Sequence, residues 1–227
     1  MENYTCFQIN IFKNIPEDEK KEVTSLLKTE RFSKGETIFT PYEEFEDVYM
    51  VHTGEVIIYQ MSPEGKKIIT EILRPGDIFS NFSLVFNSEV QLTDFAEAIE
   101  DSEICTMNKE EFAKLIKKYP KIALNVIKEL GRKLSEADAR IRDLALYDAT
   151  IRAINELLRL SKKDGTEIEE GKVRLNTRIT HEEFAEMIGT SRETATKLLK
   201  KLHGLGFIDI TPNKHIIVNT NKIKEPL

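Results

Sequence analysis

Residues 180–202 restrict what this chain can fold into more than any other segment, because they contain two predicted helices separated by a tight turn. Thr180 precedes Glu183 by three residues, and Thr190 precedes Glu193 by the same spacing. A hydroxyl followed three residues later by a carboxylate is typical of a capping box at a helix start. A glycine between the two boxes is expected to end the first helix. The segment therefore predicts a helix-turn-helix.

The two predicted helices have an apolar face, on which Ala185 and Ala195 are small enough for the helices to cross closely. The opposite face is polar. In such a pair the second helix enters the DNA major groove, where Arg binds guanine and a carboxylate accepts a hydrogen bond from cytosine. The alternative is that Glu193 only completes its cap and that the cations form an ordinary solvated surface. The candidate base-reading residues are Arg192, Glu193, Thr196 and Lys197.

A hairpin is predicted after the second helix. Two short apolar runs, residues 207–210 and 216–218, flank a turn that contains Pro212 and Asn213. They predict a β-hairpin wing. Lys214 at its tip is a candidate phosphate contact, although a single Lys on a turn is more often only solvated.

The charge is distributed unevenly along the chain. The formal net charge is -6, and residues 1–119 contain 13 basic and 23 acidic residues. Residues 172–224 contain 10 basic and 5 acidic residues. Affinity for nucleic acid depends largely on Lys and Arg that neutralise phosphates. We therefore expect the DNA contact in the C-terminal segment.

Composition indicates a soluble, cytoplasmic protein without a membrane partner. No apolar stretch is long enough to span a bilayer, and the N-terminus lacks the basic and apolar regions of a signal peptide. Cys6 and Cys105 are the two cysteines, too few for a disulfide framework or a four-thiolate iron-sulfur cluster. In a reducing compartment both are expected to be free thiols.

Residues 120–146 predict one long helix that begins at Pro120. Apolar or small side chains recur in it at alternating spacings of four and three, which is the pattern of a coiled-coil seam. The seam favours parallel pairing with a second copy of the chain, and the alternative is a single amphipathic helix packed on its own domain. The seam consists of Ala123, Ile127, Leu130, Leu134, Ala137, Ile141 and Leu144.

The seam breaks at residues 146–148, where Asp148 is the predicted N-cap of a new amphipathic helix. Gly165 and Gly171 then predict a loop before a strand at residues 173–179.

The segment before residue 108 shows short alternating runs divided by glycines, which predict a small antiparallel β-barrel. Helices are predicted before it, at residues 16–28, and after it, where Asn108 and Glu111 form a cap. A metal-binding enzyme of the cupin kind would need a ligand cluster. His52 is the only histidine before residue 181, so a metal site with two or three histidines is excluded. We therefore predict that His52 is a residue at the end of a strand and not a metal ligand.

Over nearly its whole length the chain resembles the CRP/FNR family of the cyclic-AMP receptor protein and the fumarate-nitrate reductase regulator. The matching motifs are KGETIF at 34–39, VYMVHTGEV at 48–56, RPGDIF at 74–79, LALYDATIR at 144–152 and IGTSRETATKLLKKL at 188–202.

The resemblance implies a homodimeric, non-enzymatic transcription regulator that binds double-stranded DNA, and RNA polymerase if it activates transcription. It implies an α+β fold: an effector-sensing antiparallel β-barrel of the cyclic-nucleotide-binding jelly-roll kind at 1–119, a dimerisation helix at 120–146, and a winged helix-turn-helix at 147–227. The helix would relay a signal from barrel to winged domain.

Arg192, Glu193 and Lys197 match the base-reading positions of the cyclic-AMP branch, whereas Glu193, Thr196 and Lys197 resemble those of the redox branch more loosely. We therefore expect a palindromic site whose half-sites lie about one helical turn, roughly 34 Å, apart. The candidate phosphate contacts are Thr150, Thr190, Ser191, Thr194 and Lys214.

The effector pocket departs from the family pattern. Asn81 stands where cyclic-nucleotide members have Glu, and Leu92 stands where they have the phosphate-binding Arg, before Thr93. Residues 75–108 contain no Lys or Arg, so a buried phosphate would lack a cation. On the long helix the adenine-contacting positions are Ala137 and Asp138. Cyclic AMP is therefore not the expected effector.

Other inputs stay open: a neutral or cationic small molecule, redox state at Cys105, or no effector. A haem that carries a gas would take its axial ligands from His52, Cys6, Cys105 or the N-terminus. A different class of function is a small-molecule-binding protein whose helix pair serves only interaction. The sequence does not distinguish an activator from a repressor.

Overall fold

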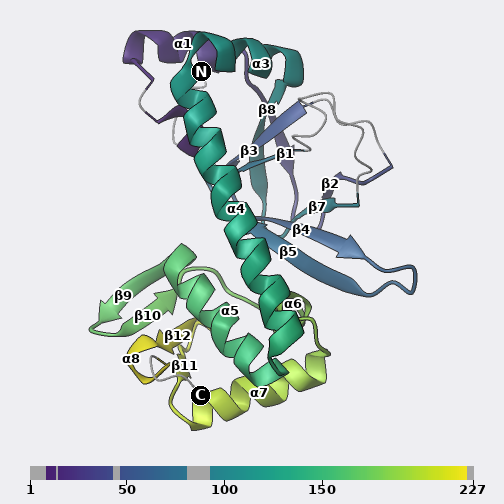
Figure 1. The fold of residues 1–227 in the computed structure, drawn as a ribbon, viewed down its shortest axis with the longest axis vertical. Helices are drawn as coiled ribbons and strands as arrows, with labels where there is room; N and C mark the ends of the chain where they lie inside the picture. Colours follow the sequence, from purple (N-terminus) through teal and green to yellow (C-terminus); the bar gives the residue numbers. More distant parts are fainter. Residues whose placement is uncertain (1–8, 14, 43–46, 81–92, 224–227) are drawn as a thin grey trace. The chain divides into compact units, whose positions relative to one another are not determined.

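The computed structural model describes residues 9–13, 15–42, 47–80 and 93–223. The chain forms two compact units, Met1–Leu134 and Ser135–Leu227, and each is described by itself (Figure 1). No helix within these described ranges is long and apolar enough to cross a membrane.

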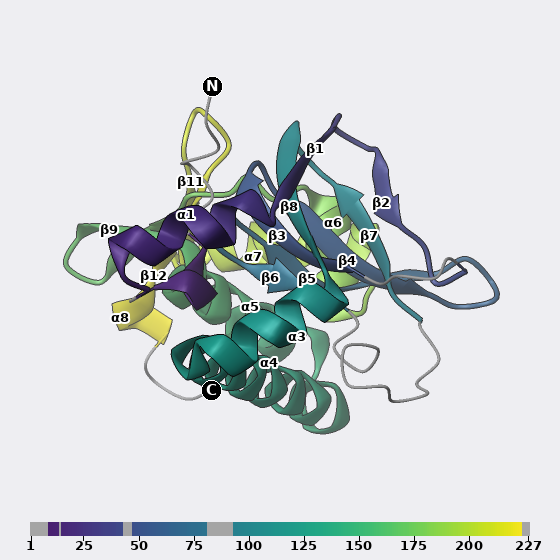
Figure 2. The same cartoon turned by 90° about the horizontal axis from the view of Figure 1, so that it is seen from above.

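The first unit is built on two four-stranded antiparallel sheets, which we call the sandwich (Figures 1 and 2). One sheet has the order β1-β8-β3-β6, and the other has the order β2-β7-β4-β5. Most neighbouring strands are distant in sequence, as in a jelly roll. The strands are β1 (Lys28–Phe32), β2 (Thr37–Phe39), β3 (Asp47–Thr53), β4 (Val56–Met61), β5 (Lys67–Leu73), β6 (Ile78–Phe79), β7 (Phe95–Ala98) and β8 (Ser102–Asn108).

Helices that pack against the β1-β8-β3-β6 sheet complete the first unit. They are η2 (Asn10–Phe12), α1 (Glu17–Ser25), α3 (Lys109–Lys118) and the beginning of α4 (Pro120–Leu146). One core lies between these helices and β3 and β8, and it includes Phe12, Phe112 and Ile122. A second core, with Phe39, Val56 and Ile104, lies between the sheets.

The predicted jelly-roll class is confirmed, with two sheets in place of one closed barrel. The alternating runs form β2, β3, β4, β5 and β8, and the predicted helices form α1, α3 and α4. Asn108 caps α3 by accepting a hydrogen bond from the Glu110 N–H at 2.9 Å. Sequence analysis did not predict β1, β6 or β7.

The described part of the second unit consists of the end of α4, four further helices and a sheet of order β11-β12-β10-β9 (Figure 1). Asp148 caps α5 as predicted, because its carboxylate accepts from the Thr150 and Ile151 N–H groups. The elements are α5 (Ala149–Asp164), β9 (Gly165–Glu169), β10 (Lys172–Leu175), α6 (His181–Ile188), α7 (Arg192–Gly204), β11 (Ile208–Ile210), β12 (Ile216–Asn219) and α8 (Thr220–Ile223).

Two expectations were wrong. Gly165 begins strand β9, which pairs with β10, whereas a loop was expected there. Every residue of β9 is exposed, so this strand lacks the alternation of buried and exposed residues by which a half-buried strand is recognised in a sequence. Cys105 is fully buried and disulfide-bonded, whereas a free thiol was expected from the compartment. The other cysteine, Cys6, lies outside the described residues.

Candidate nucleic-acid interface

The first helix of the predicted pair begins at a complete capping box. The Thr180 hydroxyl accepts from the Glu183 N–H at 3.1 Å, and the Glu183 carboxylate accepts from the Thr180 N–H at 2.7 Å. This arrangement satisfies two N–H groups that a helix start otherwise leaves unpaired. The predicted box at α6 is confirmed.

The turn between the helices depends on Gly189, whose φ of 64° lies in the left-handed region. Most residues with a side chain avoid that conformation, so glycine ends α6 at low cost. The Thr190 N–H still donates back to the Ala185 carbonyl at 2.9 Å, which keeps Thr190 in the turn.

The N-cap of α7 is Ser191, so the predicted Thr190 box was wrong by one residue. The Ser191 hydroxyl accepts from the Thr194 N–H at 3.3 Å. The chain first returns to an extended conformation at Ser191, because Thr190 remains bonded to α6.

The two helices cross over buried small and apolar side chains, including Ala185 and Ala195. Arg152 of α5 holds the end of α6 in place. Its Nε donates to the Ile188 carbonyl at 2.9 Å, and its guanidinium also reaches the Gly189 and Tyr147 carbonyls. These carbonyls would otherwise be left without partners at the helix ends.

The exposed face of α7 presents the predicted base-reading charges. Arg192, Glu193 and Lys197 are all exposed, and the Arg192 side chain is 68% accessible. Arg192 Nε lies 3.8 Å from the Glu182 carboxylate, a loose contact that leaves its donors available. Hydrogen bonds from the backbone N–H of Glu193 and from Ser191 lower the pKa of the Glu193 carboxyl, so it is an acceptor at neutral pH.

Thr196 differs from the other candidates because it is half-buried and already has a partner. Its Oγ1 lies 2.9 Å from Nδ1 of His181, the first residue of α6. Sequence reasoning did not select His181. A histidine that begins a helix gives no signal that it will meet a residue fifteen positions later.

The candidate phosphate contacts occupy the start of α5, the α6–α7 turn, the start of α7 and the wing. Thr150 and Thr190 are half-buried, whereas Ser191 is exposed. The Ser191 and Thr194 hydroxyls lie 3.0 Å apart. Lys214 is exposed in the turn between β11 and β12 with a φ of 63°, and its N–H donates to the Thr211 carbonyl.

The predicted seam of α4 is largely exposed. Ile127, Leu134 and Ile141 are spaced seven residues apart, and each is 63–65% accessible. Ala137 and Leu144 are also exposed, while Ala123 and Leu130 are half-buried. The helix therefore presents an apolar stripe that the described part of the chain does not cover.

The end of α4 is joined to α5 by a buried charged cluster, here called the reading-unit cluster: Arg140, Asp143, Glu156 and Arg159. Arg140 donates to Glu156 at 3.0 Å, and Arg159 lies 2.8 Å from Glu156 and 2.6 Å from Asp143. The Glu156 side chain is 1% accessible. Neighbouring Glu156 and Asp143 outweigh desolvation and raise the pKa of the Arg159 guanidinium.

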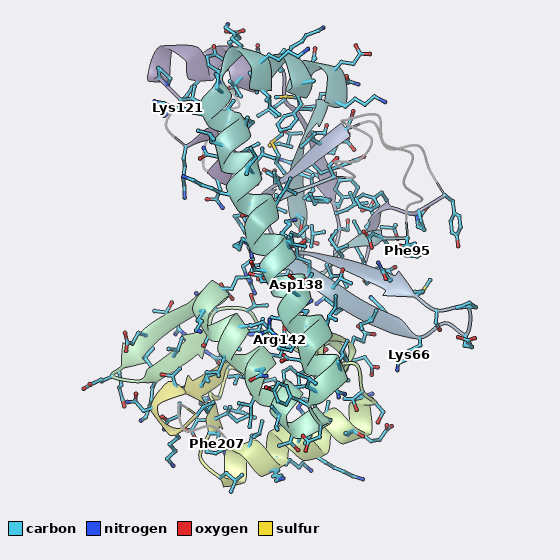
Figure 3. All side chains as sticks on the ribbon, viewed as in Figure 1. Lys66, Phe95, Lys121, Asp138, Arg142 and Phe207 are labelled. Atoms are coloured by element: carbon cyan, nitrogen blue, oxygen red, sulfur yellow. The ribbon has the colours of Figure 1, made fainter. Side chains whose placement is uncertain are left out.

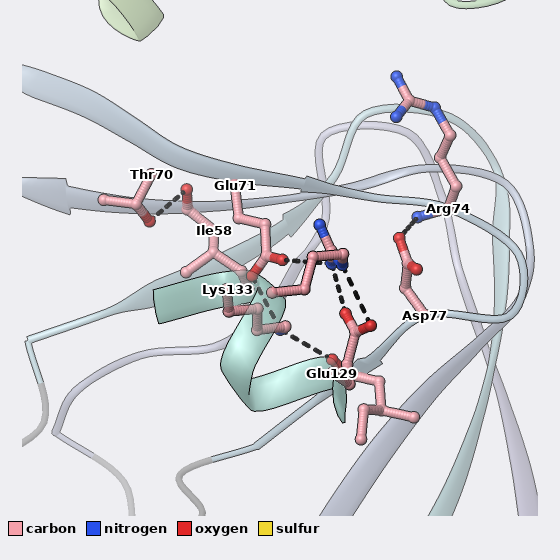
Figure 4. Close-up of polar contacts among 9 residues, drawn as sticks. Ile58, Thr70, Glu71, Arg74, Asp77, Glu129 and Lys133 are labelled. Carbon is pink, nitrogen blue, oxygen red and sulfur yellow. Dashed lines mark hydrogen bonds and ion pairs between the residues drawn. The ribbon is translucent and has the colours of Figure 1, made fainter. Parts of the chain in front are cut away.

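A comparable group joins the first part of α4 to β5, and we call it the sandwich cluster: Glu71, Glu129, Arg132 and Lys133. Figure 4 labels Glu71, Glu129 and Lys133. Lys133 Nζ donates to the Glu71 carboxylate at 2.9 Å and to the Ile78 carbonyl at 3.0 Å. Arg132 pairs with Glu129. The Glu71 side chain is 17% accessible, so this cluster is less buried than the reading-unit cluster.

The predicted effector-pocket residues are described only in part. Asn81 and Leu92 lie outside the described residues. Thr93 is exposed at the edge of the sandwich, where its hydroxyl accepts from the Gln60 amide at 3.1 Å. Ala137 and Asp138 are exposed on α4, in the second unit. Asp138 is labelled in Figure 3.

The side chain of His52 in β3 is largely buried, and its Nε2 lies 3.9 Å from the Glu103 carboxylate. Within the described ranges, no group of three or more His, Cys, Asp and Glu side chains has the arrangement of a metal site.

Comparison with known proteins gives the two units separate matches. A cyclic nucleotide-binding domain model matches residues 29–119, and a Crp-like helix-turn-helix domain model matches residues 152–225. The CRP-like cAMP-activated global transcriptional regulator of Mycobacterium tuberculosis is 27% identical over 94% of each chain. The global nitrogen regulator of Synechocystis sp. is 28% identical over 84% of each chain.

Among solved structures, a mutant of CooA from Carboxydothermus hydrogenoformans matches with a TM-score of 0.78 and 27% identity. The match covers 89% of this chain and 88% of that one.

Fold, helix pair and relatives together define a DNA-binding transcriptional regulator with a cyclic-nucleotide-binding-like domain. The chain belongs to the CRP/FNR family.

Proposed function

We propose that the protein binds a palindromic DNA site as a homodimer and regulates transcription in response to an effector other than cyclic AMP. The observation that carries the proposal is the exposed set of Arg192, Glu193 and Lys197 on a capped helix pair. In this proposal the protein has no catalytic activity, acts in the cytoplasm, and contacts RNA polymerase if it activates transcription.

We assign a base to each exposed base-reading candidate of α7 from the hydrogen-bonding groups of its side chain. Arg192 presents a planar fork suited to guanine, Glu193 accepts from cytosine, and Lys197 reaches guanine or a phosphate. Residues at the starts of α5 and α7, in the turn between α6 and α7 and in the wing bind the DNA backbone and set the register of α7 in the groove. These phosphate contacts are Thr150, Thr190, Ser191, Thr194 and Lys214.

The dimer is proposed from the exposed stripe on α4. Large apolar side chains such as Ile127, Leu134 and Ile141 lose favourable burial while they face water. Their seven-residue spacing fits a parallel coiled coil with a second copy, in which each stripe covers the other. Two copies would present two α7 helices to two half-sites.

The effector is proposed to lack a phosphate. Relatives from Mycobacterium tuberculosis and Thermus thermophilus carry cyclic AMP in their names. This chain has no Lys or Arg between residues 75 and 108, so it has no cation there to replace the hydration of a phosphate. A neutral or cationic small molecule fits the acidic composition of this stretch better.

A haem-dependent gas sensor is the second candidate, and the likeness to CooA supports it. CooA is described as a CO-dependent transcription factor, and its imidazole-bound form is 26% identical to this chain. Reconstitution with haem tests this candidate, because bound haem gives a Soret band. If titration shows only weak, unsaturable absorbance, the gas-sensor candidate is wrong.

DNA reading is tested by selecting binding sites from a random duplex pool with the full-length protein. We expect a palindromic consensus, and we expect Arg192→Ala to lower affinity for it by roughly fivefold to a hundredfold. Arg31→Ala is the matched control, since Arg31 is an exposed cation on β1 of the sandwich. Enrichment of a single asymmetric half-site, or of no sequence, would contradict the proposal.

Ile141→Glu tests the dimer. Placing a carboxylate in the apolar seam should convert the dimer to monomer in sedimentation velocity and weaken binding to the palindrome. Arg142→Glu, at the adjacent exposed position of α4, should leave the dimer intact. A monomeric unaltered protein at micromolar concentration would refute the pairing.

A further inference from the structure

A hydrogen bond joins α6 and α7, the two helices of the helix-turn-helix. Nδ1 of His181, at the start of α6, lies 2.9 Å from Oγ1 of Thr196 in α7. Both residues are half-buried, whereas Arg192 and Lys197 are exposed. The pair therefore lies at the border between the packed interior and the polar face that we propose reads DNA.

Thr196 is part of that polar face by its position in α7. It follows Arg192 by four residues, so the two side chains are neighbours on the helix surface, and it precedes Lys197 directly. Threonine inside a helix commonly turns its hydroxyl back to the carbonyl four residues earlier. The Thr196 hydroxyl instead meets an imidazole from the other helix.

This contact determines which hydrogen-bonding atoms of Thr196 remain available to a base, according to the tautomer of His181. A hydroxyl has one proton and two lone pairs, and Nδ1 donates or accepts according to the tautomer. If Thr196 donates to His181, its lone pairs accept from the amino group of adenine or cytosine. If His181 donates, the Thr196 O–H is free for guanine O6 or thymine O4.

The hydrogen bond also orients the methyl group of Thr196, because the methyl and the hydroxyl share one carbon. A threonine methyl is a good contact for the thymine methyl group. Without His181 the side chain would be free to take the rotamer that bonds to its own helix.

We propose that His181 is a positioning residue for base recognition: by holding Thr196, it sets the base preference at one step of each half-site. This inference rests on the proposed function. It predicts a loss of preference at a single base pair rather than weaker binding to every sequence.

The test repeats the site selection with full-length variants. His181→Phe keeps a ring but removes the hydrogen bond, and Thr196→Ala removes the hydroxyl. Each should reduce preference at the same single step by on the order of threefold to tenfold, the value of one neutral hydrogen bond. His181→Asn, which keeps a hydrogen-bonding atom at the δ position, should restore much of the preference.

Two further variants sharpen the test. The double variant H181F/T196A should lose no more than T196A alone, because both changes remove one interaction. His203→Phe is the matched control, since His203 is an exposed histidine at the end of α7 that pairs with Asp209. It should leave every step unchanged.

The outcomes separate the two proposals. If the unaltered protein selects no sequence, the proposed function fails, and the role of His181 fails with it. If the protein selects a palindrome but H181F weakens all sequences equally, or changes no step, the role of His181 is wrong and the proposed function stands. If circular dichroism shows that H181F is unfolded, T196A decides, and a T196A variant with unchanged preferences refutes the positioning role.

Discussion

The sandwich and the second unit, Ser135–Leu227, which we call the reading unit, are stabilised by contacts that span different distances along the sequence. In the sandwich, β1 pairs with β8, so that Lys28 lies opposite Thr106. In the reading unit, α6 and α7 are consecutive, and each begins at a cap within four residues: Thr180 with Glu183, and Ser191 with Thr194. The comparison shows why short motifs reveal the reading unit more completely than the sandwich.

In each unit one charged cluster attaches α4 to a neighbouring element. The two clusters differ in how deeply their carboxylates are buried. In the reading-unit cluster Glu156 is 1% accessible, whereas in the sandwich cluster Glu71 is 17% accessible. A buried charge that loses its partners costs more free energy than a partly solvated one. We therefore expect the end of α4 to be held more firmly to α5 than its beginning is held to β5.

The largest effect is expected for Glu156→Ala, which removes the buried carboxylate that Arg140 and Arg159 share and leaves Arg159 with Asp143. The free energy of unfolding of the reading unit should fall by about 3–5 kcal/mol. Denaturant titration gives the size of the loss, and hydrogen exchange should place it in α5. Glu169→Ala, which removes an exposed ion pair to Lys172, is the control and should change little. If Glu156→Ala lowers the free energy of unfolding no more than Glu169→Ala does, the reading-unit cluster does not hold α4 to α5 as we expect.

Glu71→Ala should cost less, about 1.5–3 kcal/mol, because water reaches part of the sandwich cluster. Removal of the Glu71 carboxylate leaves Lys133 with the Ile78 carbonyl as a partner. The measurement is the same titration, with Glu30→Ala on β1 as the exposed control. If Glu71→Ala lowers the free energy of unfolding more than Glu156→Ala does, the expectation that α4 is held more firmly to α5 than to β5 is wrong.

Gly131→Ala should stabilise α4 by about 1 kcal/mol, because glycine is a poor helix former. A Cβ at Gly131 meets nothing within 4 Å. Gly54→Ala is the opposite case, since its φ is 81° and a Cβ would lie 2.6 Å from the Asp101 carbonyl oxygen. Thermal unfolding should show a higher midpoint for G131A and a lower one for G54A. A lower midpoint for both would refute the prediction.

The smallest effect concerns the cap of α5. Hydrogen bonds from the Ile151 and Thr150 N–H groups lower the pKa of the Asp148 carboxyl. Because the folded pKa is lowered, the stabilisation is present above the unfolded value of about 3.9 and is lost as the pH falls through the folded value. A carbon-detected NMR titration should give a pKa below that ordinary value. A pKa at or above it would mean that the cap does not form in solution.

The sequence predicted the reading unit in detail where its signals are local. Capping residues, Gly189 and the apolar periodicity fixed α5, α6, α7 and the wing to within a few residues. The α7 cap was placed at Thr190 instead of Ser191, because the spacing rule does not show how many residues the turn uses. Base-reading candidates followed from residue type, but the contact between His181 and Thr196 did not, since it requires the crossing of two helices.

For the sandwich, the sequence predicted the fold class but not which strands pair with one another. The apolar runs of β3 and β4 were visible in the sequence, although β4 buries four successive residues and only β3 alternates. The strand β1 has four exposed residues in five and no alternation, so only its pairing with β8 defines it. The two residues of β6 are too few for any pattern.

By itself, the sequence determined the helix pair, the long helix with its apolar seam, the basic C-terminal segment and the absence of a cation between residues 75 and 108. These features depend on residue type and on spacings shorter than a helix or a strand. Only the tertiary structure decided which strands pair, which charges are buried against α4, and that His181 holds Thr196. Those contacts join residues that are distant along the chain, and no local spacing encodes the distance between them.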